Sequence, residues 1–148
     1  MLAVLDSNVW IDILVFDDPA TRPIRTALEE GSLIAPIDAR CRDELVHVLD
    51  YPQFSARQID KGVALATLER LARYVEPDLT PPVPPLPRCK DRDDQKFLEL
   101  ACATHVAWLI TKDRALLKLS RRTVRDFGFR VDTPLLFVQG ALAPALTV

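Results

Sequence analysis

Four acidic residues of this chain stand in apolar surroundings, at Asp6, Glu44, Asp94 and Asp113. Asp6 closes the apolar run at residues 2–5, and apolar residues follow Asp6, Asp94 and Asp113 at the spacing of one helix face. Glu44 lies on the apolar stripe of its own expected helix, away from the solvated face. A carboxylate in such a position is costly to desolvate unless it is paired or binds a metal ion. The acids outnumber the obvious basic partners on these faces, which indicates a cation site.

Convergence of the four acids would favour one kind of chemistry. Two carboxylates about 5 Å apart repel by about 3 kcal/mol at an effective dielectric constant of about 20, so a cluster must take up protons or bind cations. Oxygen ligands favour Mg²⁺ or Mn²⁺ over zinc, and these ions activate water for phosphoryl transfer. The chain has no spacing typical of a Ser/His or Cys/His nucleophile, and its four glycines form no phosphate-binding loop. Phosphodiester hydrolysis is the reaction class that these residues predict.

Each aspartate also has a purely structural interpretation. An aspartate at a helix start caps free backbone N–H groups and lies at the positive end of the helix dipole. This interpretation is open for Asp6, Asp94 and Asp113 taken singly, and it does not apply to Glu44, which lies inside its helix. The coincidence of all four acids favours the cation site.

The expected elements alternate between strands and helices, which predicts an α/β sandwich around a parallel sheet. Asp6 and Asp113 end two of the strands, and sites in such sheets form at the carboxyl ends of strands. At 148 residues we expect a single domain over 1–148. The expected strands cover residues 1–6, 33–36, 107–111 and 128–131. The expected helices cover residues 8–16, 19–30, 38–49, 55–74 and 93–105, with a short helix after Asp113 and a last one capped by Thr133.

Residues 77–87 hold half of the twelve prolines and therefore predict an extended segment with no helix. A surface loop joining two helical blocks is one interpretation. The P-x-x-P spacing leaves a second one open, in which the segment docks in an aromatic groove of another protein.

Composition indicates the cellular compartment of the protein and the kind of contact it could make with nucleic acid. Three cysteines without a C-x-x-C pair fit neither a disulfide framework nor a zinc cage, and they favour a reducing cytoplasm. We expect no signal peptide and no membrane span, because no apolar stretch reaches the required length. The net charge of −2 argues against non-specific coating of nucleic acid, although residues 112–130 are strongly basic. That stretch is either a solvated helix face or a contact for a phosphate backbone beside the acids.

Four segments, in this order and spacing, resemble the PIN-domain family of ribonucleases. They are VLDSNVWID, DELVHVL, DRDDQKFLELA and LITKDRALL, and the similarity is closest to the toxin components of prokaryotic toxin–antitoxin pairs (VapC-like). The resemblance implies a three-layer α/β/α sandwich with a central, mostly parallel sheet, and three or four acids that bind Mg²⁺ or Mn²⁺. By the same resemblance these acids are Asp6, Glu44, Asp94 and Asp113 here.

Two neighbouring acids complicate the third position of this set. Only one of Asp93 and Asp94 can face the apolar stripe, and the spacing to Phe97 and Leu98 favours Asp94. Asp91 matches an additional acid common in this subfamily, and it is either a further metal ligand or a turn or cap residue.

The resemblance implies a metal-dependent endoribonuclease that leaves 5′-phosphate and 3′-hydroxyl ends, and that is the toxin of a toxin–antitoxin pair. It also implies a small antitoxin protein as partner and a homodimer. Two alternatives stay open, a catalytically silent PIN-fold interaction module and a receiver-like phosphoryl-transfer domain. Candidate contacts for RNA or a partner are Arg114, Lys118, Arg121, Arg122 and Arg125.

Overall fold

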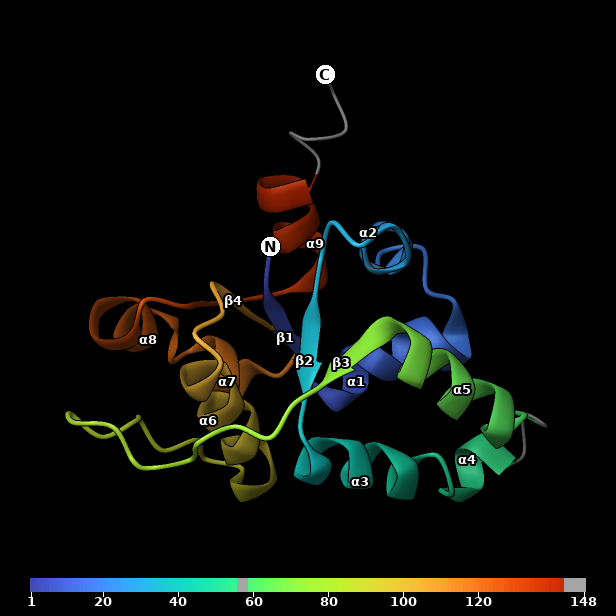
Figure 1. Ribbon diagram of the computed structural model, residues 1–148, viewed down its shortest axis with the longest axis horizontal. Coiled ribbons are helices and arrows are strands. Elements are labelled where there is room, and N and C mark those ends of the chain that lie inside the picture. Colours follow the sequence, from blue (N-terminus) through green and yellow to red (C-terminus); the bar gives the residue numbers. More distant parts are fainter. Residues whose placement is uncertain (56–58, 143–148) are drawn as a thin grey trace.

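A computed structural model of the chain describes residues 1–55 and 59–142, and in these residues every strand pair is parallel (Figure 1). The central strand β4 lies between β1 and β5, and β2 pairs with β3. The parallel pairing confirms the predicted α/β class. The strands are β1 (Ala3–Leu5), β2 (Ala35–Ile37), β3 (Ala72–Tyr74), β4 (Trp108–Ile110) and β5 (Arg130–Asp132).

Backbone contacts before β1 and β2 join the two sheets edge to edge. Leu2 and Ile34 form a parallel bridge, and the Ala3 amide donates to the Ile34 carbonyl at 3.1 Å. The strands therefore follow the order β3-β2-β1-β4-β5. Leu5 lies opposite Ile110 in the register of β1 and β4. The chain consequently leaves both strands at neighbouring points on the carboxyl edge.

Helices flank the strands, with α6, α7 and α8 on one side and α1, α3 and α5 on the other (Figure 1). Helix α6 packs on β1 and β4, and α3 packs on both α1 and α6. The helices are α1 (Ser7–Ile11), α2 (Arg22–Glu30), α3 (Ala39–Val48), α4 (Pro52–Ser55), α5 (Lys61–Leu71), α6 (Gln95–Ala103), α7 (Arg114–Leu117), α8 (Ser120–Phe127) and α9 (Pro134–Phe137). π-Helical turns extend α1 over Asp12–Phe16 and α9 over Val138–Leu142, and a 3₁₀ turn over Arg92–Asp94 precedes α6.

Several helix ends follow from local sequence chemistry. Gly31 ends α2 with a φ of 79°, a left-handed conformation that glycine adopts at no steric cost. Thr133 accepts a hydrogen bond from the Leu136 amide at 3.2 Å, and Pro134 occupies the first turn of α9. The end of α2 at Glu30 and the cap at Thr133 confirm the predicted end of the helix over residues 19–30 and the predicted cap of the last helix.

The prediction of one helix over residues 55–74 was wrong at its end. Helix α5 stops at Leu71, and Ala72–Tyr74 form the edge strand β3 beside β2. Beyond the strand, the Val75 amide donates to the Ile37 carbonyl at 2.9 Å. Pairing with β2 overrides the helical pattern of this stretch, as tertiary context often does. Residues 56–58 of the expected helix lie outside the described residues.

Residues 75–91 contain neither helix nor strand, which confirms the predicted loop (Figure 1). The Gln95 side chain of α6 anchors the end of this loop. Its Oε1 accepts from the Cys89 amide at 2.7 Å, and its Nε2 donates to the Pro87 carbonyl at 3.1 Å. The loop therefore returns to the start of α6 at a defined point.

Large side chains fill the space between strands and helices. Trp10, Phe97, Phe129 and Phe137 are among the largest fully buried side chains, and the Phe137 ring meets the Trp108 ring edge-on at 5.3 Å. None of the helices within residues 1–55 and 59–142 combines the length and apolar character needed to cross a bilayer.

Candidate metal centre

Three aspartates lie together at the carboxyl edge of the sheet. Asp91, Asp94 and Asp113 each offer one carboxylate oxygen, and the three oxygens lie within 4.8 Å of one another. Asp113 comes from the segment after β4, whereas Asp91 and Asp94 come from the turn before α6. Asp93 is exposed and is not part of this group. Three carboxylate oxygens at this separation are a donor set that fits Mg²⁺ or Mn²⁺.

Asp6 lies at the end of β1 and is only 2 % exposed. It accepts a hydrogen bond from the Val9 amide at 3.0 Å and another from the Thr111 hydroxyl. Its pKa is raised to about 6, mainly by burial and to a smaller extent by the charge of Asp113, against the opposing effect of the Thr111 hydrogen bond. Asp6 thus lies within the electrostatic field of the aspartate group.

Thr111 connects the ends of β1 and β4. Its hydroxyl donates to Asp6 and accepts from the Asp113 amide at 3.0 Å, and the side chain is fully buried. One short polar side chain therefore fixes the relative positions of two acids from different strands.

The pKa of Asp94 is raised to about 7. Burial is the main cause, followed by the negative charge of Asp113 and a hydrogen bond between the two carboxyl groups. The charges of Asp91 and Asp6 raise the pKa further. The aspartates therefore concentrate negative charge that a proton or a cation must neutralise.

Capping and clustering coexist in these residues. Asp113 Oδ1 accepts from the Ala115 amide at 2.7 Å and caps α7, and Asp6 caps α1 through Val9. The caps fix the carboxylates, and their helices begin at the same edge of the sheet. The two interpretations are therefore compatible for Asp6 and Asp113, whereas the Asp94 side chain caps no backbone amide of α6.

Glu44 has different neighbours from the three grouped aspartates. It is half-buried on α3, where its Oε2 accepts from the Ser7 hydroxyl at 2.5 Å and its Oε1 from the Lys96 ammonium group at 2.6 Å. The group of three oxygens does not include Glu44. Its role as a metal ligand stays a prediction, and in this structure both of its oxygens have protein partners.

A second ion pair fixes the segment that carries Asp113. The Lys112 ammonium group lies 2.5 Å from Oδ2 of Asp12, a buried residue in the π-helical turn after α1. Sequence reasoning missed both Asp12 and Lys96. The available signal for Asp12 was its position between the apolar residues Ile11 and Ile13.

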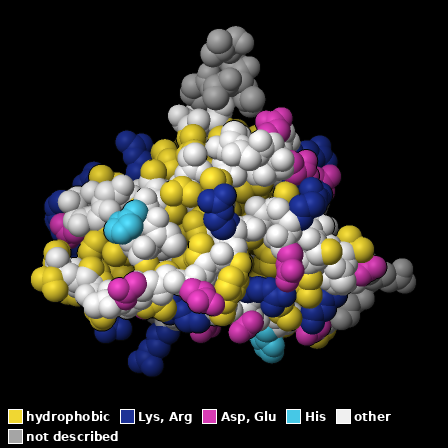
Figure 2. Space-filling model, viewed as in Figure 1, with side chains coloured by type: hydrophobic (Ala, Val, Ile, Leu, Met, Phe, Trp, Pro, Cys, Tyr) yellow, Lys and Arg dark blue, Asp and Glu magenta, His cyan; other side chains and the backbone are white. Residues whose placement is uncertain are grey.

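The basic candidates are exposed on the two helices that follow Asp113. Arg125 forms an ion pair with Asp126 at 2.9 Å, so part of its charge is neutralised locally. Figure 2 shows basic and acidic side chains interspersed on one face of the molecule, in keeping with the small net charge. The exposed residues of this set are Arg114, Lys118, Arg121, Arg122 and Arg125.

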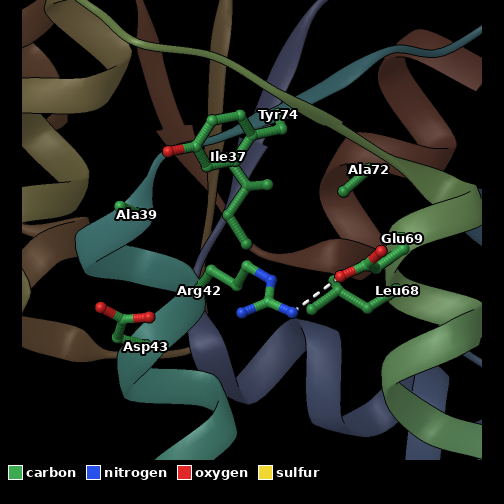
Figure 3. Close-up of a pocket in the computed structure, with 8 residues that line it drawn as sticks. All are labelled: Ile37, Ala39, Arg42, Asp43, Leu68, Glu69, Ala72 and Tyr74. Carbon is green, nitrogen blue, oxygen red and sulfur yellow. Dashed lines mark hydrogen bonds and ion pairs between the residues drawn. The ribbon is translucent and has the colours of Figure 1, made fainter.

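A separate cavity of about 410 Å³ lies between α3 and α5, where Arg42 points to Glu69 and donates to it at 2.7 Å (Figure 3). Ile37 and Tyr74, the last residues of β2 and β3, close its other side. The residues that line this cavity include no member of the aspartate group. The acids therefore form a centre of their own at the strand ends.

Comparison with known proteins identifies the family of this chain. The PIN domain family matches the chain over residues 3–115, which include the aspartates at the strand ends and before α6. No curated protein and no solved structure matches the chain in the same comparisons. Since the matched region spans more than half of the sequence and carries the acidic centre, the chain belongs to the PIN domain family.

Proposed function

We propose that this protein is a metal-dependent endoribonuclease. The observation that carries the proposal is the group of three carboxylate oxygens within 4.8 Å at the carboxyl edge of a PIN-domain sheet. PIN domains are typically metal-dependent nucleases. The raised pKa of Asp94 supports the proposal, because a site that holds excess negative charge has an energetic reason to bind a cation.

The acids share the task of binding the metal ion in this proposal. Asp91, Asp94 and Asp113 hold the divalent ion, and Asp6, fixed by Thr111, and Glu44 contribute as further ligands. When bound, the ion supplies a Lewis acid that activates water and stabilises charge on the phosphate oxygens. Water adds to phosphorus and the bond to the 3′-oxygen breaks, which leaves a 5′-phosphate and a 3′-hydroxyl.

The basic residues of α7 and α8 hold the RNA in this proposal. Both helices follow Asp113 in the chain, α7 directly and α8 from Ser120, and their basic side chains are exposed. Arginine and lysine contacts to phosphates position a strand without reading its sequence. The substrate class that we propose is single-stranded or loop RNA, and the proposed contacts are Arg114, Lys118, Arg121, Arg122 and Arg125.

The toxin role rests on the resemblance of the sequence segments to toxins of toxin–antitoxin pairs. In this role the protein acts in the cytoplasm, forms a homodimer and is held inactive by a small antitoxin protein. Expression alone should arrest growth, and co-expression of the adjacent reading frame should restore it. Growth that continues under strong expression of active enzyme would contradict the toxin role and leave the nuclease proposal standing.

The test of the nuclease proposal is cleavage of a mixed RNA pool by purified protein with Mn²⁺. We expect cleavage that EDTA abolishes and that Asp94→Asn lowers by more than about 100-fold, because the variant removes a charged oxygen ligand. Asp50→Asn is the matched control, because Asp50 is an exposed acid that pairs with Lys61. Cleavage by Asp94→Asn at the wild-type rate, or cleavage indifferent to EDTA, would overturn the proposal.

A further inference from the structure

Glu44 is held from two sides by residues that lie close in sequence to Asp6 and Asp94. Ser7 follows Asp6 directly, and Lys96 lies two residues after Asp94. Their side chains contact different oxygens of Glu44, at 2.5 Å and 2.6 Å. Three helices therefore meet at one carboxylate, because Ser7 belongs to α1, Glu44 to α3 and Lys96 to α6.

Lys96 is not an ordinary surface lysine. Its side chain is 19 % exposed, and its ammonium group lies 5.8 Å from the centre of the Phe97 ring. Glu44 is similarly shielded, at 22 %. Ion pairs with limited access to water are screened less than exposed pairs, and a short ammonium–carboxylate contact of this kind is strong. The Lys96–Glu44 pair therefore restrains both side chains.

We propose that Lys96 is a positioning residue of the metal centre, which together with Ser7 fixes the Glu44 carboxylate between the starts of α1 and α6, the helices that follow Asp6 and Asp94. The inference rests on the proposed function, since it names the residue that sets how Glu44 contributes to metal binding. Glu44 supports the bound ion only from the place that Lys96 and Ser7 define. Partners that orient the groups around a metal site typically change metal affinity by about 10–100-fold.

Removing the Lys96 ammonium group should change the affinity for Mn²⁺ in a direction that depends on the role of Lys96. A lysine near a cation site also repels the ion, so if repulsion were its main effect, Lys96→Met would bind Mn²⁺ more tightly. If Lys96 acts by positioning Glu44, the same variant frees Glu44 to turn toward solvent, and Mn²⁺ binding weakens. The direction of the change therefore separates the two roles.

The experiment is calorimetric titration of the metal-free protein with Mn²⁺, without RNA. We expect about tenfold weaker binding by Lys96→Met and by Glu44→Gln, and no further loss in the double variant, because both changes remove one interaction. Lys96→Arg, which keeps the charge and the donors, should bind Mn²⁺ more tightly than Lys96→Met. Lys61→Met should match wild type, since it breaks a comparable pair with Asp50 at 2.7 Å on the exposed surface.

Unfolding of each variant in EDTA shows whether it keeps the fold. If Lys96→Met does not fold, Ser7→Ala gives the same test from the other side and should also weaken Mn²⁺ binding. Unchanged or tighter binding by Lys96→Met, or losses that add in the double variant, would overturn the inference while the nuclease proposal stands. No Mn²⁺ binding by wild type would overturn both.

Discussion

At the scale of single residues, the aspartate centre stores electrostatic repulsion in the metal-free protein. This repulsion is seen in the raised pKa of Asp94, which is caused by burial and by the charge of Asp113. The folded protein binds this proton more tightly than the unfolded chain does, since the folded pKa of about 7 exceeds the ordinary aspartate pKa of 3.8. The group therefore favours folding more as pH falls from about 7 to about 4, and it opposes folding above that window.

Asp94→Asn should stabilise the metal-free protein at about pH 8. The gain is about 1–2 kcal/mol after allowance for the solvent around this partly exposed side chain, or about 3–6 °C in Tm for a chain of this length. Thermal unfolding in EDTA measures it, and the difference should shrink at about pH 5, where Asp94 is protonated. With saturating Mn²⁺ the wild type should have the higher Tm, because it gains more binding free energy from the ion than Asp94→Asn does. Equal Tm values at about pH 8 in EDTA would contradict the prediction.

Thr111→Val should destabilise the protein by about 2–3 kcal/mol, because it removes the hydroxyl that serves the buried Asp6 carboxylate and the Asp113 amide. Urea unfolding without metal measures the loss, and Thr111→Ser should restore most of it. Thr104→Val is the matched control, since Thr104 donates only to a backbone carbonyl, that of Leu100, at 2.7 Å. A loss in Thr111→Val no larger than in Thr104→Val would show that the link between the strand ends contributes little.

At the scale of elements, α3 places Glu44, and its first turn depends on Asp38. This buried aspartate accepts from the Cys41 amide at 3.0 Å and forms an ion pair with Arg40 at 3.2 Å. Arg40 also pairs with Glu99 at 3.1 Å, which ties the start of α3 to α6. The helix that carries Glu44 is therefore attached to the helix that carries Lys96 at two points.

Asp38→Ala should lower the free energy of unfolding by about 2 kcal/mol, at the upper end for a helix cap, because it also removes a buried ion-pair partner. Asp60→Ala is the control, since Asp60 caps α5 through Val63 at 3.1 Å but is exposed. The loss of free energy of unfolding in Asp60→Ala should be about half as large as in Asp38→Ala. Chemical unfolding of both variants gives the comparison, and equal losses would mean that burial and the Arg40 pair add nothing to the cap.

The sequence predicts those elements whose signals are local. The cap at Thr133, the end of α2 before Gly31 and the strands that end shortly before Asp6 and Asp113 follow from neighbouring residues, and the structure contains each of them. Strand β3 could not be predicted in this way, because it depends on pairing with β2, which lies more than thirty residues earlier. The partners of Glu44 were missed for the same reason, since Lys96 is distant in sequence and only the packing of α3 on α6 brings it near.

At the scale of the whole molecule, acidic and basic residues lie on different elements around the carboxyl edge of the sheet. The acids gather where β1 and β4 end, and the basic helix α7 begins directly after Asp113, with α8 following at Ser120. A strand of RNA that reaches the centre would meet repulsion from the aspartates and attraction from these helices. The proposed function therefore requires that binding of RNA depend strongly on salt even though the net charge is −2.

Replacing Arg121 and Arg122 by glutamine should flatten this salt dependence. For single strands the logarithm of affinity falls with the logarithm of salt by about 0.7 per phosphate contact, so the loss of two contacts lowers the slope by about 1.4. Fluorescence anisotropy with a labelled single strand in EDTA measures binding without cleavage. Arg70→Gln with Arg73→Gln is the control of equal charge, because both residues are exposed on α5 and β3. If both double variants flattened the slope equally, net charge alone would govern binding, and α8 would not be an RNA contact.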